Sequence, residues 1–162
     1  MTYAARQVLD DLRKVHKILE DETTDDGWRL NWILAVTLAR AVGHVLSKVD
    51  VAEGRVSKAH SDSAYAAWKR DQSEHNIFRN FIEVERNSVL KEYESTVLQS
   101  DNLPILVDDG NGSMSVEILT ENLYRPIEYG EYAGSDARDI LGEAIDWWEA
   151  ELVKLETLQK EP

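Results

Sequence analysis

The sequence predicts a mainly α-helical fold: a bundle of four to five helices with a small β-hairpin and loop inserted before the last helix. Apolar residues recur at helical spacing over four long segments of the chain. That period is lost over residues 103–132, where short alternating runs and turn residues occur instead. The 162 residues suit a single domain, 1–162, with a substantial hydrophobic core.

The first two predicted helices run from Tyr3 to Leu19 and from Trp28 to Val49. A turn at residues 23–27 separates them, and Asp25 or Asp26 is suited to cap the second helix. The apolar arc of the second helix is wide, which predicts a central helix with neighbours on more than one side. Residues 50–61, with Gly54 and several small or polar side chains, are expected to form a loop or a broken turn.

The third predicted helix begins near residues 61–63, breaks around residues 70–74 and continues to about Leu98. Its later part carries one stripe at spacings of four, three and four residues: Phe78, Ile82, Glu85 and Val89. Arg86 lies directly beside this stripe. Buried or half-buried charges are costly unless they are paired, so Glu85 and Arg86 indicate either a structural ion pair or a functional site.

The inserted segment opens at Pro104 and reads as a hairpin followed by an ordered loop. Residues 105–107 and 114–119 are the expected strands, joined by a loose turn at residues 108–113. We expect the segment 103–132 to lie outside the bundle. Ser135 or Asp136 caps the last helix, whose inner stripe is Ile140, Leu141, Ala144, Ile145, Trp148, Leu152 and Leu155.

Composition narrows the functional classes. The chain has no cysteine, which excludes disulfides, thiolate metal sites and cysteine nucleophiles. Its 31 acidic against 18 basic residues give a net charge of −13, which disfavours broad electrostatic binding of nucleic acid. None of the four histidines follows a glutamate by three residues, as a di-iron bundle requires. We expect no metal and no cofactor.

The same reading predicts a cytoplasmic protein without a membrane span. The opening residues do not resemble a signal peptide, because no apolar run follows a basic start. The most apolar stretch, from Leu30 to Val49, is interrupted by polar or charged side chains at Asn31, Arg40, His44 and Lys48.

A central apolar helix followed by a long helix with the sequence Arg86-Asn87-Ser88-Val89-Leu90-Lys91 resembles the HEPN superfamily (higher eukaryotes and prokaryotes nucleotide-binding). Catalytic members carry Arg-Asn-x-x-x-His. The resemblance covers the helix order from Tyr3 to Leu155, with the hairpin as an insertion. It implies a helical bundle that forms a homodimer. In catalytic members it implies metal-independent RNA cleavage by the arginine and histidine across the dimer interface.

Lys91 stands where the motif has histidine. A lysine, with a reference pKa of about 10.4, is a fixed cation at neutral pH and a poor general base. The resemblance therefore favours a dimeric, non-catalytic module that acts through protein or ligand binding. The alternative is a metal-independent endoribonuclease with Arg86 at its site, in which case RNA is also a partner.

The candidate catalytic residues are Arg86, Asn87 and Lys91, and the candidate binding residues are Arg40, His44 and Glu83. Each has a structural alternative. Arg86 is suited to pair with Glu83 or with a carboxylate on a neighbouring helix, and Arg40 with Glu83 or Glu85. Asn87 and Lys91 would then form a solvated helix edge.

Two further alternatives stay open. His44 is either a core-edge imidazole bonded to a backbone carbonyl or the histidine that works with Arg86. Of the neighbouring Trp147 and Trp148, one ring faces inward and the other toward a neighbour. That neighbour is either the core of the same chain or a second protomer.

Overall fold

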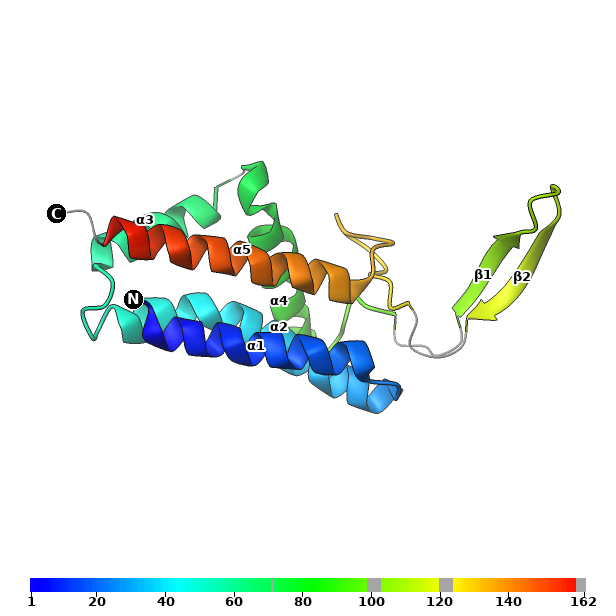
Figure 1. Ribbon diagram of the computed structural model, residues 1–162, viewed down its shortest axis with the longest axis horizontal. Coiled ribbons are helices and arrows are strands. Elements are labelled where there is room, and N and C mark those ends of the chain that lie inside the picture. The colour runs from blue at the N-terminus through cyan, green and yellow to red at the C-terminus, as the bar shows by residue number, and fades with distance from the viewer. Residues whose placement is uncertain (71, 99–102, 120–123, 160–162) are drawn as a thin grey trace.

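The computed structural model describes residues 1–70, 72–98, 103–119 and 124–159. It confirms a mainly helical fold with a two-stranded antiparallel hairpin before the last helix. Figure 1 shows α1, α2 and α5 running alongside one another, and α1 packs on both of the others. The elements are α1 (Tyr3–Asp21), α2 (Asp25–Val45), α3 (Lys58–Trp68), α4 (Glu83–Glu92), β1 (Leu103–Asp108), β2 (Met114–Leu119) and α5 (Ala137–Leu158).

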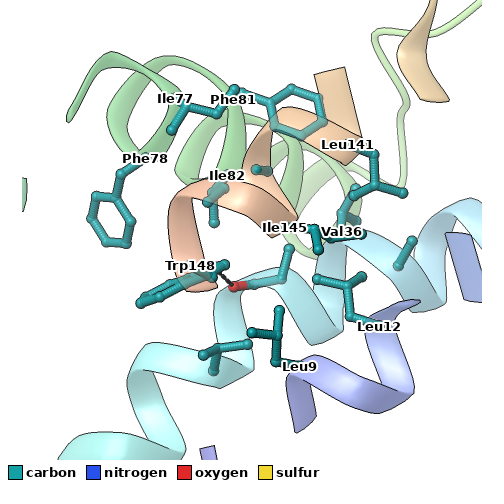
Figure 2. Packing of buried hydrophobic residues seen from close by; sticks show 14 of the residues in the cluster. Leu9, Leu12, Val36, Ile77, Phe78, Phe81, Ile82, Leu141, Ile145 and Trp148 are labelled. Carbon is teal, nitrogen blue, oxygen red and sulfur yellow. Dashed lines mark hydrogen bonds between the residues drawn. The ribbon is translucent and has the colours of Figure 1, made fainter. Parts of the chain in front are cut away.

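The core lies between α1, α2, α5 and the segment that precedes α4, and Figure 2 shows its side chains meeting there. Trp28, Trp32, Trp68 and Trp148 are all buried. The Nε1 of Trp148 donates a hydrogen bond to the carbonyl of Ala39 at 2.8 Å, which satisfies the indole inside the core. The predicted inner stripe of α5 is buried along its whole length.

The helix α2 begins earlier than expected and has a different cap. Thr24, not Asp25 or Asp26, is the N-cap, and its Oγ1 accepts from the Gly27 N–H at 3.2 Å. The two aspartates occupy the first turn, where carboxylates stabilise the positive end of the helix. A π-helical segment, Leu46–Asp50, continues the same helix past Val45.

The expected loop over residues 50–61 is shorter than predicted. Asp50 ends the π-helical segment, and Ser57 caps α3 by accepting from the His60 N–H at 3.1 Å. The expected break is confirmed: α3 ends at Trp68, and a short 3-10 turn follows at Ser73–His75. Asp71, inside that break, lies outside the described residues.

The helix that resumes at residue 76 includes a π-helical segment, Phe78–Ile82, and runs on into α4. The prediction that it reaches Leu98 is wrong, because Tyr93 adopts a left-handed conformation with φ 57° and ends the helix. Val97 is buried and forms an antiparallel bridge with Ile127, so the chain turns back onto the bundle.

Asp136 is the N-cap of α5, one of the two predicted alternatives, and its Oδ1 accepts from the Arg138 N–H at 2.9 Å. The strands β1 and β2 pair from Leu103↔Leu119 to Asp108↔Met114, slightly longer than predicted. Figure 1 shows the hairpin projecting away from the helices, as expected. Residues 99–102 and 120–123 of the predicted inserted segment and its approach lie outside the described part of the chain.

By length and composition alone, residues 25–50 form a helix that could cross a membrane, although the sequence reading expected no such stretch. The central helix of a globular bundle passes the same test. Here α2 places its tryptophans and small side chains in the core: Trp28, Trp32, Ala35, Val36, Ala39, Val42 and Gly43.

Candidate functional site

A groove runs between the outer faces of α2 and α4, and we call it the α2–α4 groove. Its cavity has a volume of about 330 Å³. It brings together five of the six residues selected from the sequence. The lining residues are Thr37, Arg40, Ala41, His44, Glu83, Arg86, Asn87 and Leu90.

Helical periodicity explains why these side chains share one groove. On α2 the lining residues stand at positions i, i+3, i+4 and i+7 from Thr37, and on α4 they follow the same spacing from Glu83. The opposite faces of both helices are buried, through Val36 and Ala39 on α2 and through Glu85 and Val89 on α4. Core packing therefore orients the polar faces toward the groove.

Arg86 is half-buried and makes no ion pair among the described residues. Its NH1 donates to Asn87 Oδ1 at 2.9 Å. The expected pair with Glu83 is wrong, because Glu83 accepts from Lys69 Nζ at 2.6 Å instead. The charge of Glu83 is thus neutralised from α3's C-terminal end, and the guanidinium of Arg86 keeps its remaining donors for another acceptor.

Arg40 is held by aromatic rings. Its Cζ lies 5.9 Å from the centre of the Tyr65 ring and 5.6 Å from that of Phe78. The expected pairs with Glu83 or Glu85 do not form. Cation–π contact positions a guanidinium without neutralising its charge. Within the part of the chain that the structure describes, neither arginine of the groove has a carboxylate partner.

Glu85 belongs to the core, not to the groove. Its side chain is buried and accepts from Trp32 Nε1 at 3.3 Å and from the Thr96 hydroxyl. Burial raises the pKa of Glu85, and these two hydrogen bonds offset part of that effect. The unusual charge pair in the sequence therefore separates into a structural glutamate and an available arginine.

His44 lies in the groove, whereas Lys91 lies outside it. His44 lines the groove with an exposed side chain, so the expected core-edge imidazole bonded to a carbonyl is wrong. That arrangement belongs to His16, whose Nε2 lies 2.9 Å from the Arg138 carbonyl oxygen. Lys91 is exposed and lies outside the groove lining.

Trp147 packs within its own chain. Its Nε1 donates to the Glu74 carbonyl at 3.0 Å, and its ring contacts those of Trp68, His75 and Phe78. Of the two alternatives, core packing holds for both tryptophans. The pair therefore gives no structural support for a dimer interface.

Sequence reasoning missed four contributors to the site: Lys69, Thr37, Ala41 and Leu90. Lys69 is remote from Glu83 in the sequence, and no local signal links them. Thr37, Ala41 and Leu90 continue the helical spacing of the residues that were selected, so that spacing is a signal that predicts them. The Thr37 hydroxyl donates to the Ile33 carbonyl at 2.7 Å.

The groove offers two guanidinium groups, one imidazole and one amide, which together suit an anionic ligand. It also contains the carboxylate of Glu83, whose charge Lys69 balances. Among the described residues, no three His, Asp or Glu side chains are gathered as metal ligands. A comparison of the chain with family models, curated proteins and solved structures gives no match. The chemistry of the groove is therefore argued from its own residues.

Proposed function

We propose that this chain is a HEPN-like helical module that binds a small phosphate-bearing ligand in the α2–α4 groove and does not cut RNA. The observation that supports the proposal best is the pair of arginines, Arg40 and Arg86, without carboxylate partners among the described residues. A guanidinium presents a planar fork of donors that matches the oxygens of a phosphate.

The charge of the surroundings bears on the size of the ligand. Acidic residues outnumber basic ones by 31 to 18, and several other arginines, such as Arg6 and Arg13, are bound to carboxylates. A concave site with two uncompensated guanidinium groups attracts a small anion. The acidic remainder of the surface repels a long polyanion, which favours a small ligand over extended RNA.

Binding fits the groove better than catalysis does. Lys91, which replaces the histidine of the catalytic motif, lies outside the groove lining. A general base must reach the proton that it removes, and it works best with a pKa near the operating pH. Lys91 does not line the groove, so the motif residues that do line it, Arg86 and Asn87, supply charge and hydrogen bonds but no general base.

Calorimetric titration with inorganic pyrophosphate tests the proposal. Arg40→Gln and Arg86→Gln should each weaken binding about tenfold, since a charge-assisted hydrogen bond is worth about 1.5–3 kcal/mol. Arg29→Gln is the matched control. Arg29 also lies on α2 and over an aromatic ring, at 5.8 Å from the centre of Tyr93, but it is not part of this groove. Equal weakening by all three variants would count against the groove.

The alternative function is metal-independent RNA cleavage. One observation favours it: His44 lines the same cavity as Arg86 and Asn87, and so supplies from α2 the imidazole that the motif lacks. The test is cleavage of a single-stranded RNA oligonucleotide in the presence of EDTA. Cleavage lost in folded His44→Ala and Arg86→Ala variants would establish this function. Intact RNA supports the binding proposal.

The resemblance also leads us to propose a homodimer. A sedimentation experiment at tens of micromolar, a concentration that detects dimers with a Kd of about 1 µM, tests this directly. A purely monomeric species would contradict it.

A further inference from the structure

The hairpin of β1 and β2 packs against little else in the described structure. Within the described ranges its strands pair only with each other, and the hairpin projects from the helices. An isolated two-stranded hairpin is at best marginally stable in water. Four large apolar side chains on it are more than half exposed: Leu106, Met114, Val116 and Ile118. Such a surface calls for a partner.

The strand register places these four side chains on one face. Leu106 lies opposite Val116, and Pro104 and Asp108 lie opposite Ile118 and Met114. Directly opposed residues of an antiparallel pair point to the same face, and alternate residues share it. The other face carries Ser115 and Glu117 from β2 and the half-buried Leu103, Ile105 and Val107 from β1. The strand β2 therefore has one apolar and one polar side over residues 114–118.

The hydrogen-bond pattern tells which backbone groups are free. The Asp109 N–H donates to the Ser113 carbonyl at 3.1 Å, which makes this pair a hydrogen-bonded one. In an antiparallel ladder, hydrogen-bonded pairs alternate with pairs that point outward. Residues 104, 106 and 108 of β1 and residues 114, 116 and 118 of β2 therefore turn their backbone groups to the outer edges.

The two edges are not equivalent. On β1, Pro104 occupies an outward position and has no N–H to offer, a common way to protect an edge strand. On β2, the outward residues Met114, Val116 and Ile118 each present both a donor and an acceptor. Within β2 no proline, lysine or bulge blocks this edge.

We propose that the outer edge of β2 pairs with the β2 edge of a second copy, antiparallel and centred on Val116, to form a four-stranded intermolecular sheet. The inference rests on the proposed homodimer but not on what the groove binds. A two-fold axis at Val116 sets Val116 against its own copy and Met114 against Ile118. All outward donors of the three residues then meet acceptors, and an interface of this kind is self-complementary.

The side chains fit the same register. Glu117 lies opposite Ser115 of the other copy. The only charged residue of the β2 segment 114–118 therefore does not face another negative charge across the interface. The apolar side chains of the two copies join into one continuous face. Because a single strand edge is paired, the interface lies at the small end of the range for specific complexes, below about 1,200 Å². We therefore expect a dimer that dissociates on dilution.

Sedimentation equilibrium of the full chain tests the pairing. Val116→Pro removes the central outward donor from both copies and leaves the inward ladder intact, so the dimer should weaken at least about tenfold. Leu106→Pro is the matched control, since Leu106 lies opposite Val116, is similarly exposed and turns its N–H to the other edge. It should leave the dimer unchanged.

A charge swap tests the symmetry axis. Val116→Lys and Val116→Glu should each be monomeric, because each places like charges opposite each other at the axis. An equimolar mixture of the two should form a heterodimer.

A dimer that persists in Val116→Lys would overturn the β2 pairing and would mean that the homodimer forms through another surface. Equal weakening by Val116→Pro and Leu106→Pro would also overturn it, by indicating a partner on the apolar face. A monomeric wild type would overturn both the homodimer and the β2 pairing. The titration with pyrophosphate tests the proposed ligand of the groove independently of these two.

Discussion

At the scale of the residue, Asp50 has the most demanding structural role. Its carboxylate is buried and accepts from the backbone N–H groups of Ala4 and Ala5 at 3.0 and 2.9 Å. Thr2, the N-cap of α1, makes no capping bond of its own to this helix. Asp50 therefore caps α1 from the end of the second helix, and Arg55 NH1, at 3.2 Å, balances its charge.

Replacing Asp50 should destabilise the fold strongly. Asp50→Ala leaves the backbone donors of Ala4 and Ala5 without their acceptor and removes one of the two carboxylates that Arg55 binds, which we expect to cost about 2–4 kcal/mol in the free energy of unfolding. Urea denaturation monitored by tryptophan fluorescence measures it. Asp10→Ala is the control, because Asp10 is exposed and, among the described residues, forms an ion pair only with Arg13, three residues away. A similar loss in the two variants would contradict the capping role.

For single residues, burial could be predicted from the sequence but the partners of charged side chains could not. The stripe Phe78, Ile82, Glu85 and Val89 is buried as expected, because helical period alone determines which side of a helix faces the core. The partners of the charged residues are different. Lys69 pairs with Glu83 and Asp50 caps α1 through contacts between distant parts of the chain, and no local pattern encodes those contacts.

At the scale of the element, the packing of α2 on α5 depends on Gly43. A Cβ at Gly43 would lie 2.8 Å from Cη2 of Trp148, whose ring is buried and held by its bond to Ala39. The helix boundaries were harder to predict than the helices themselves. The left-handed Tyr93, which ends α4, interrupts a sequence with good helix formers on both sides.

Gly43→Ala should destabilise the protein although alanine favours helix. In an open helical site the change stabilises by about 1 kcal/mol. At Gly43 the clash with Trp148 should outweigh that gain and lower the midpoint of thermal unfolding. Gly142→Ala on α5 is the matched control, because its Cβ would meet His16 at an ordinary 3.6 Å. It should raise the midpoint. A higher midpoint for both variants would refute the close approach.

At the scale of the whole molecule, a network of charges joins the first helix to the last. Arg6 binds Glu149 and Glu156 at 2.7 and 3.0 Å, and Arg13 binds Glu149 at 2.7 Å. The hydrogen bond from Arg6 lowers the pKa of Glu156 to about 2, although burial opposes the change. The pKa of Glu149 is also lowered, first by Arg13 and then by Arg6.

Because of this network, the free energy of unfolding depends on pH in the acidic range. A carboxyl whose folded pKa lies below its unfolded value of 4.5 stabilises the fold above that pH. The contribution fades as the pH falls toward 2. Glu156→Gln should therefore be less stable than wild type at pH 7, and the difference should shrink below pH 4.5. Urea titrations at pH 7 and pH 3 test this. A difference that is unchanged at pH 3 would contradict it.

The central claim is that Arg40 and Arg86 form an anion site in the α2–α4 groove. Nuclear magnetic resonance of the arginine Nε–Hε groups tests it most directly, because each side chain gives its own signal. On titration with inorganic pyrophosphate, the signals of Arg40 and Arg86 should shift together along one saturating curve, while the signal of Arg29 stays in place. Shifts of the same size at all three arginines, or none at Arg40 and Arg86, would contradict the claim.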